Sequence, residues 1–177
     1  MSQNTPSPDI RPGSDGLRGA YLELLPGDWV VGSLGDQFRT LLGSCISVIL
    51  TDPRRTVGAM CHIVHVGPAP VDDPDNTAYA LPALEAMFAG LQRMGINPRM
   101  CEAYLYGGGN MFPELFRTRH VGTSNADWVR SFLQHQGIPI RDEQVGGCGY
   151  RKISWAVGSH LPLVDFVAPA PDVHHGG

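Results

Sequence analysis

Short apolar runs, each closed by a turn signal, constrain the fold of this chain more than any other feature of its sequence. Residues 46–50 are rich in β-branched side chains and are followed by Asp52-Pro53, and residues 57–66 form a second run of the same kind. β-Branched residues favour strands, whereas Gly, Pro and Asp favour the turns between them. We therefore expect two paired, buried strands, with Cys45 at the entrance of the first.

Several other segments carry the same strand pattern. Residues 21–25 and 28–31 flank Pro26-Gly27, a strong turn signal, and this arrangement predicts a β-hairpin. Further strands are expected at residues 100–106, 138–145, 150–157 and 161–167, the last two joined by a turn at 158–160.

Two segments show helical spacing instead. Residues 78–94 place Leu84, Met87 and Leu91 on one face, and Gly95 is a typical stop. A second helix is expected to be capped by Ser124 or Asn125 and to end at Gly137. Hairpins mixed with only two helices favour an α+β fold over a regular βαβ succession.

Composition narrows the class of protein. The chain has 177 residues, 17 acidic against 13 basic, and its Lys and Arg residues form no cluster, which argues against a nucleic-acid partner. Residues 1–19 lack the apolar stretch of a signal peptide, and the longest apolar run, 41–50, is about half of a membrane span. We expect a cytoplasmic protein without membrane insertion: one domain at 20–167, between tails at 1–19 and 168–177.

The four cysteines form no C-x-x-C pair, which favours reduced thiols over a disulfide framework or a zinc ribbon. Cys61, His62, His65 and Cys101 could be considered as metal ligands, but Cys61 and His62 point to opposite faces of a strand. No metal and no cofactor is therefore expected. Cys61 and Cys101 are interpreted as core thiols.

Cys45 is the best candidate for chemistry. It follows Gly43 and Ser44 and stands immediately before a buried strand. Gly43 permits close approach of a substrate, and the N–H groups near Ser44 and Cys45 could receive a developing oxyanion. The alternative is a buried structural cysteine, because free cysteines are among the most buried residues.

A nucleophilic cysteine needs a base, and His62 lies on the neighbouring expected strand. His65 competes for this role, but the two histidines point to opposite faces of a regular strand, so only one can meet Cys45. A structural role for either histidine remains the alternative. The glycine run at 107–109 is not a phosphate loop, because no Gly-Lys-Ser/Thr follows; it is either a tight loop or part of a cleft.

Taken together, these residues resemble the CheD family of chemoreceptor glutamine deamidases over about residues 21–166. The matching segments are Leu42-Gly43-Ser44-Cys45, Gly58-Ala59-Met60 followed by His62, Gly107-Gly108-Gly109-Asn110-Met111-Phe112, and Gly137-Ile138-Pro139 leading to Val145-Gly146-Gly147.

The resemblance implies a Cys-His amidohydrolase in a fold similar to the catalytic domain of deamidating bacterial toxins, with mixed sheets packed as a sandwich and helices outside. It assigns Cys45 as nucleophile and His62 as base, with Gly43 and Ser44 at the substrate. The family commonly uses a threonine six residues before the cysteine; this chain has Arg39 there, and Thr40 is next to it. Thr40 is assigned the role provided that the local register or a bulge turns it inward, and the alternative is an ordinary strand threonine. Cys148 stands where the family usually has asparagine.

The implied activity is conversion of receptor glutamine side chains to glutamate, together with hydrolysis of glutamate methyl esters. The implied partners are the cytoplasmic helices of chemoreceptors and a CheC-type phosphatase. A binding module without catalysis is the rival hypothesis, motivated by the departures at Arg39 and Cys148. A cysteine peptidase is less favoured, because nothing marks a cleft for a substrate backbone.

Overall fold

A computed structural model describes residues 11–12, 19–113 and 121–169. Its described strands form two five-stranded sheets. The first sheet has the order β1 (Arg11–Pro12), β2 (Ala20–Leu24), β4 (Gln37–Leu42), β9 (Tyr150–Ala156) and β10 (Leu163–Val167). The second has the order β3 (Trp29–Ser33), β6 (Val57–Cys61), β5 (Ile46–Thr51), β7 (Glu102–Gly107) and β8 (Ile140–Val145).

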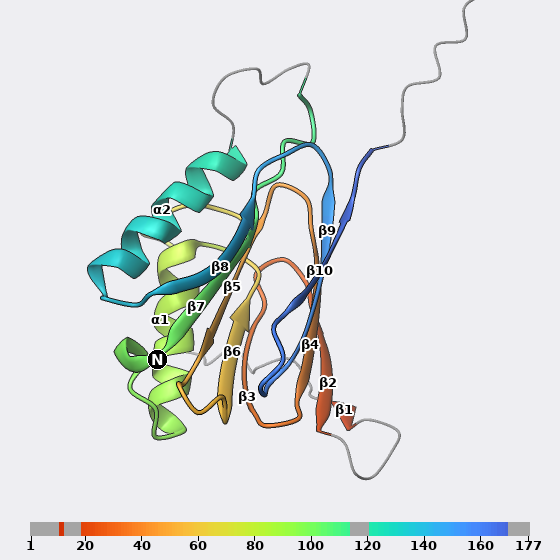
Figure 1. The fold of residues 1–177 in the computed structure, drawn as a ribbon. Helices are drawn as coiled ribbons and strands as arrows, with labels where there is room; N and C mark the ends of the chain where they lie inside the picture. Colours follow the sequence, from red (N-terminus) through yellow and green to blue (C-terminus); the bar gives the residue numbers. More distant parts are fainter. Residues whose placement is uncertain (1–10, 13–18, 114–120, 170–177) are drawn as a thin grey trace, which may run out of the picture.

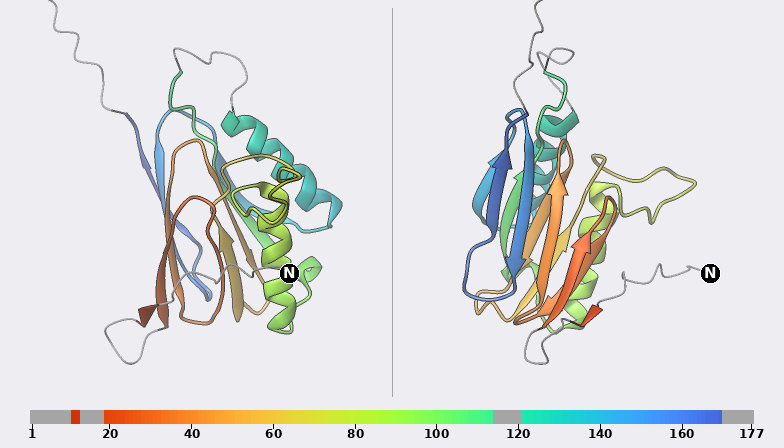
Figure 2. Two further views of the ribbon diagram at one scale, coloured as in Figure 1. Left: turned by 180° about the vertical axis from the view of Figure 1, so that it is seen from behind. Right: turned by 90° about the vertical axis from the view of Figure 1, so that its right-hand side faces the viewer.

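Helices α1 (Ala80–Arg93) and α2 (Val121–His135) both lie on the outer side of the second sheet (Figures 1 and 2). Helix α1 packs on β3 and β6, and α2 packs on β5, β7 and β8. A short 3-10 helix, η1 (Pro98–Met100), leads into β7. The molecule therefore has three layers, helices, second sheet and first sheet, which agrees with the expected sandwich of mixed sheets with outside helices. Within the described residues no helix is long and apolar enough to cross a bilayer.

Strand β5 is buried along its whole length because it has a layer on each side. Successive strand residues point to opposite faces. Ile46, Val48 and Leu50 accordingly join the cluster beneath the helices, whereas Ile49 joins the cluster between the sheets. The predicted pairing of this run with β6 is confirmed as an antiparallel ladder.

The hairpin predicted around Pro26-Gly27 is wrong. Strand β2 pairs in parallel with β4, and β3 pairs antiparallel with β6, so the two arms belong to different sheets. The amide of Gly27 donates to the carbonyl of His62 (2.9 Å) and so holds this turn against the second sheet. A turn signal identifies where the chain reverses, but partner strands are chosen by burial of distant side chains.

Most other boundaries lie close to the predicted ones, but strand β4 (Gln37–Leu42) was not among the predicted segments, and β6 ends at Cys61 rather than at residue 66. Helix α2 begins at Val121, before the predicted caps, and Asn125 lies inside it, where its side-chain amide donates to the carbonyl of Val64 (3.1 Å). The hairpin of β9 and β10 is confirmed. Of the expected tails, residues 11–12 pair with β2, and residues 1–10, 13–18 and 170–177 lie outside the described part of the chain.

Candidate active site

Cys45 lies in the turn that carries the chain from one sheet to the other. Strand β4 of the first sheet ends at Leu42, and β5 of the second sheet begins at Ile46, so Gly43, Ser44 and Cys45 span the end of the sandwich. The Cys45 side chain is half-buried and packs against the cluster between the sheets. Cys45 is therefore not a fully buried core residue, unlike Cys61 and Cys101.

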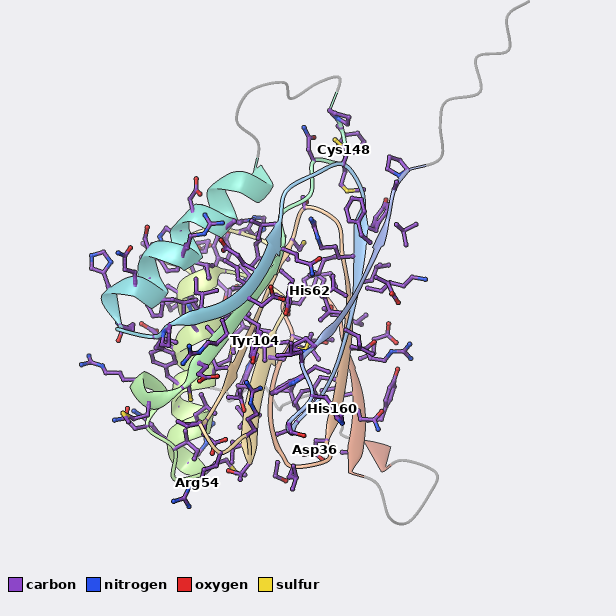
Figure 3. All side chains as sticks on the ribbon, viewed as in Figure 1. Asp36, Arg54, His62, Tyr104, Cys148 and His160 are labelled. Carbon is purple, nitrogen blue, oxygen red and sulfur yellow. The ribbon has the colours of Figure 1, made fainter. Side chains whose placement is uncertain are left out.

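Strand register places His62 on the same face as Cys45. Ile46 and Ile63 exchange both backbone hydrogen bonds (3.0 and 2.7 Å), which sets Ser47 opposite His62 and makes Cys45 a diagonal neighbour of His62. Diagonal positions are separated by roughly 7–8 Å, within reach of longer side chains. Strand β6 ends at Cys61, so His62 continues its register one residue beyond its end. In Figure 3, His62 lies between the two sheets.

Thr40 holds the imidazole from the opposite sheet. Its Oγ1 donates to the carbonyl of Leu24 (2.8 Å) and lies 2.8 Å from Nδ1 of His62. A hydroxyl has one proton to donate, so Thr40 must accept from Nδ1–H. This bond fixes the tautomer in which Nε2 carries the lone pair, which a general base requires.

The protonation states of the two groups follow from burial. Burial lowers the pKa of His62, an effect opposed by the Leu24 carbonyl and the Asp28 carboxylate. Burial also raises the pKa of the Cys45 thiol. Both groups are thus neutral near pH 7, a thiol beside an imidazole rather than an ion pair. Within the described residues, Nε2 has no hydrogen-bond partner and the thiol makes no hydrogen bond to the ring.

The glycine run supports the turn that carries Cys45. The amide of Gly108 donates to the carbonyl of Cys45 (2.9 Å), and the amide of Gly109 donates to the carbonyl of Gly43 (3.0 Å). Gly107 has a φ of 114°, and a side chain there would collide with the Cys45 carbonyl. Within the part of the chain described, no backbone carbonyl accepts from the amides of Ser44 or Cys45, so both remain able to donate to a substrate.

The remaining sequence candidates lie elsewhere. His65 is exposed and packs against Tyr79 with the two rings tilted, their centroids 4.7 Å apart. Cys61 and Cys101 are buried in the core, and burial raises each thiol pKa to about 12. Cys148 is exposed in the loop between β8 and β9 (Figure 3). Neither His65, Cys61 nor Cys101 faces the imidazole of His62.

Sequence reasoning missed two residues near the site. Arg151 is buried, donates from Nη1 to the carbonyl of Gly107 (3.2 Å) and lies over the ring of Phe166. Ser47 is fully buried opposite His62. Alternation along β9 could have placed Arg151 on the inner face with Ile153, and the register of β5 and β6 places Ser47.

Comparison with known proteins gives the family. The model described as CheD chemotactic sensory transduction matches residues 68–161, more than half of the chain. A protein of Albidiferax ferrireducens, named probable chemoreceptor glutamine deamidase CheD 2, is 36% identical over 140 residues, which cover 77% of this chain and 81% of that protein. The chain belongs to the CheD family.

Other similar proteins carry the same family name. The probable chemoreceptor glutamine deamidase CheD of Pseudomonas fluorescens is 32% identical, with 73% of this chain and 75% of that protein covered. The protein of the same name from Rhizobium meliloti is 35% identical, with 66% and 63% covered. The family-model match begins after Thr40, Cys45 and His62, so it does not itself include these residues.

A solved Neisseria meningitidis protein of the DUF152 family model is similar over 74% of this chain and 65% of that protein, with a TM-score of 0.42 and 13% identity. At that TM-score the likeness carries no argument about function. The expected resemblance to deamidating toxins remains a prediction.

Proposed function

We propose that this CheD protein is a cysteine amidohydrolase that converts glutamine side chains on the cytoplasmic helices of chemoreceptors to glutamate. The names of its relatives support the substrate and the reaction. The single structural observation that supports the mechanism is the bond between Thr40 and His62. This bond leaves Nε2 of His62, which has no hydrogen-bond partner among the described residues, on the same face of the sheet as the half-buried Cys45.

The first half-reaction forms a thioester. As the substrate amide approaches, Nε2 of His62 takes the thiol proton and Sγ of Cys45 attacks the side-chain carbonyl carbon. The amides of Ser44 and Cys45 donate to the oxyanion of the tetrahedral intermediate. Collapse breaks the carbon–nitrogen bond, and Nε2–H gives its proton to the departing ammonia.

The second half-reaction restores the enzyme. Nε2 of His62 removes a proton from water, which attacks the thioester, and the carbon–sulfur bond breaks to leave glutamate and the Cys45 thiol. A glutamate methyl ester fits the same sequence, with methanol in place of ammonia. Either reaction adds one negative charge to a receptor helix and so changes its electrostatics.

Because thiol and imidazole are both neutral at rest, the site relies on proton transfer during attack. A neutral resting state suits a half-buried thiol, because burial removes much of the water that would otherwise stabilise the negative charge of a permanent thiolate. We place the reaction in the cytoplasm, where the receptor helices lie. A CheC-type phosphatase is a further proposed partner.

Mass spectrometry of receptor-helix peptides tests the proposal. The native chain should convert glutamine to glutamate, and the Cys45→Ala and His62→Gln variants should not. In water enriched in heavy oxygen, the product should gain one heavy oxygen, and hydroxylamine should intercept the thioester. Conversion that survives Cys45→Ala would remove Cys45 as nucleophile, and no conversion by the native chain would favour the rival binding module.

A further inference from the structure

Ser47 is a buried polar residue that the mechanism above does not use. Its side chain is 0% exposed, and its Oγ has no hydrogen-bond partner within the described residues. Leaving a buried hydroxyl unpaired destabilises a fold, so native structures rarely keep one without a reason. Nε2 of His62 is a second buried atom without a hydrogen-bond partner among the described residues.

Strand register fixes how the two residues meet. Ile46 and Ile63 form a hydrogen-bonded pair, so the next pair inward, Ser47 and His62, is of the non-hydrogen-bonded type. The Cα atoms of such pairs are only about 4.5 Å apart, and their side chains are the closest in an antiparallel ladder. Both side chains point toward the first sheet, as the Cys45 side chain does.

The other groups around Ser47 are already committed. Tyr106 faces it from β7, but the Tyr106 hydroxyl donates to Asp142 (3.0 Å). Thr40 approaches His62 from β4 and binds Nδ1. Asp28 contributes a charge that raises the pKa of His62, but its backbone carbonyl, not its carboxylate, accepts from the His62 amide (2.9 Å). Among the described residues, Cys45 and the buried guanidinium of Arg151, which donates from Nη1 to the carbonyl of Gly107, are the remaining charged or titratable groups near the site.

We propose that Ser47 is a positioning residue whose hydroxyl accepts a hydrogen bond from Nε2–H while His62 carries the catalytic proton. The inference rests on the proposed function for its role in catalysis. In the resting protein neither atom has a hydrogen-bond partner among the described residues. On protonation, rotation of the Ser47 side chain brings its oxygen to Nε2–H while Thr40 keeps its bond to Nδ1, and the imidazolium is retained until ammonia or thiolate takes the proton.

The proposal separates stability from activity. Ser47→Ala removes an unpaired buried hydroxyl, so thermal stability should stay the same or rise. The same variant should lower kcat by roughly 10- to 100-fold, the range expected for one hydrogen bond to a charged group, with KM little changed. Ser47→Thr keeps a hydroxyl and should retain more activity than the alanine variant.

Thr51 provides a matched control on the same strand. Its buried hydroxyl donates to the carbonyl of Val57 (2.9 Å), far from the site along β5. Thr51→Val should therefore lower stability and leave kcat unchanged, the opposite pattern from Ser47→Ala.

A readout independent of deamidation completes the test. NMR titration of the His62 ring, assigned by its loss in His62→Gln, should show a lower pKa in Ser47→Ala than in the native chain and no change in Thr51→Val. An unchanged His62 pKa, an unchanged kcat in an active enzyme, or a stability loss like that of Thr51→Val would overturn the proposal. If the native chain fails to deamidate receptor peptides, the proposed function fails while the titration still decides whether Ser47 binds the imidazolium.

Discussion

Thr40 Oγ1 lies 2.8 Å from Nδ1 of His62, whereas the side chain of the preceding residue, Arg39, points out of the sandwich to the hydroxyl of Tyr21 (2.9 Å). Neighbouring strand residues face opposite sides, so only one of the two can reach the space between the sheets. In this chain the residue five positions before Cys45 faces inward, and the regular burial alternation of β4 achieves this without a bulge.

Thr40→Val should therefore reduce deamidation strongly. The isosteric change leaves Nδ1–H and the Leu24 carbonyl without their partner, which costs about 1–3 kcal/mol and frees the ring to adopt the wrong tautomer. We expect kcat to fall roughly 10- to 1000-fold in the peptide assay, consistent with loss of a positioned general base. Thr40→Ser should restore much of it.

Arg39→Ala is the matched control, because the Arg39 side chain is exposed on the opposite face of the same strand. Its kcat should equal that of the native chain within about twofold, since exposed substitutions away from a site rarely change stability by more than about 0.5 kcal/mol. A loss in Arg39→Ala as large as that in Thr40→Val would contradict the assignment of Thr40.

The pH dependence of thiol alkylation should distinguish a neutral dyad from an ion pair. Burial raises the Cys45 pKa above its usual 9.0, so the rate of alkylation should keep rising through pH 9. An ion pair would instead give a plateau at or below pH 7. Iodoacetamide and intact mass spectrometry measure this rate in Cys148→Ser, which lacks the exposed thiol, while Cys61 and Cys101 are shielded in the core.

The acid side of the activity profile reports His62. Burial lowers its pKa below the usual 6.5, and the base works only when neutral. The value of kcat/KM should therefore hold steady as the pH falls to 6.5 and decline only below it, as the ring becomes protonated. A decline that begins well above pH 6.5 would show that the imidazole is not held neutral by burial.

The resemblance to the family implies an asparagine at the position of Cys148, whose side chain is exposed. The loop around it is shaped by its glycines, with φ values of 84° at Gly146 and 72° at Gly147, and by the bond from the Asn110 amide to the Gly147 carbonyl (2.7 Å). We expect Cys148→Asn to leave melting temperature and kcat unchanged. A clear gain in kcat would instead show that the amide side chain contributes to the reaction.

Local pattern predicted most of the strands and the first helix, because β-branched runs and helical spacing are encoded in neighbouring residues. It did not predict β4 (Gln37–Leu42), the strand that carries Thr40. Strand partners were not predictable in the same way. The turn at Pro26-Gly27 was identified correctly, yet β2 pairs with β4 across a whole intervening strand, a choice made by distant apolar contacts. The first turn of α2 was missed because Val121 and Gly122 carry no cap signal.

The candidate site was predictable in its parts and not in its geometry. Cys45 and His62 could be selected by residue type and motif, but their shared face depends on the pairing of Ile46 with Ile63. Thr40 could be identified as inward-facing only once Phe38 and Leu42 were known to be buried on either side of it. Alternation along β9 indicates that Arg151 shares the inner face with Ile153, whereas the position of Ser47 opposite His62 depends on the register of β5 and β6, which a local pattern does not give.

Gly107 tests whether the glycine run supports the nucleophile. Its φ of 114° is poorly accessible to other residues, and a side chain would strike the Cys45 carbonyl. Gly107→Ala should therefore lower stability by about 2–4 kcal/mol and abolish most deamidation, because the turn of residues 43–45 must move.

Gly137 is the matched control, because its backbone also has a positive φ, 71°, but a Cβ added there would meet open space. Gly137→Ala should cost only about 1–2 kcal/mol and leave kcat intact, because strain alone does not reach the site. Thermal unfolding and the peptide assay on both variants would separate the effects, and equal activity in the two would show that contact between Gly107 and Cys45 is not needed for catalysis.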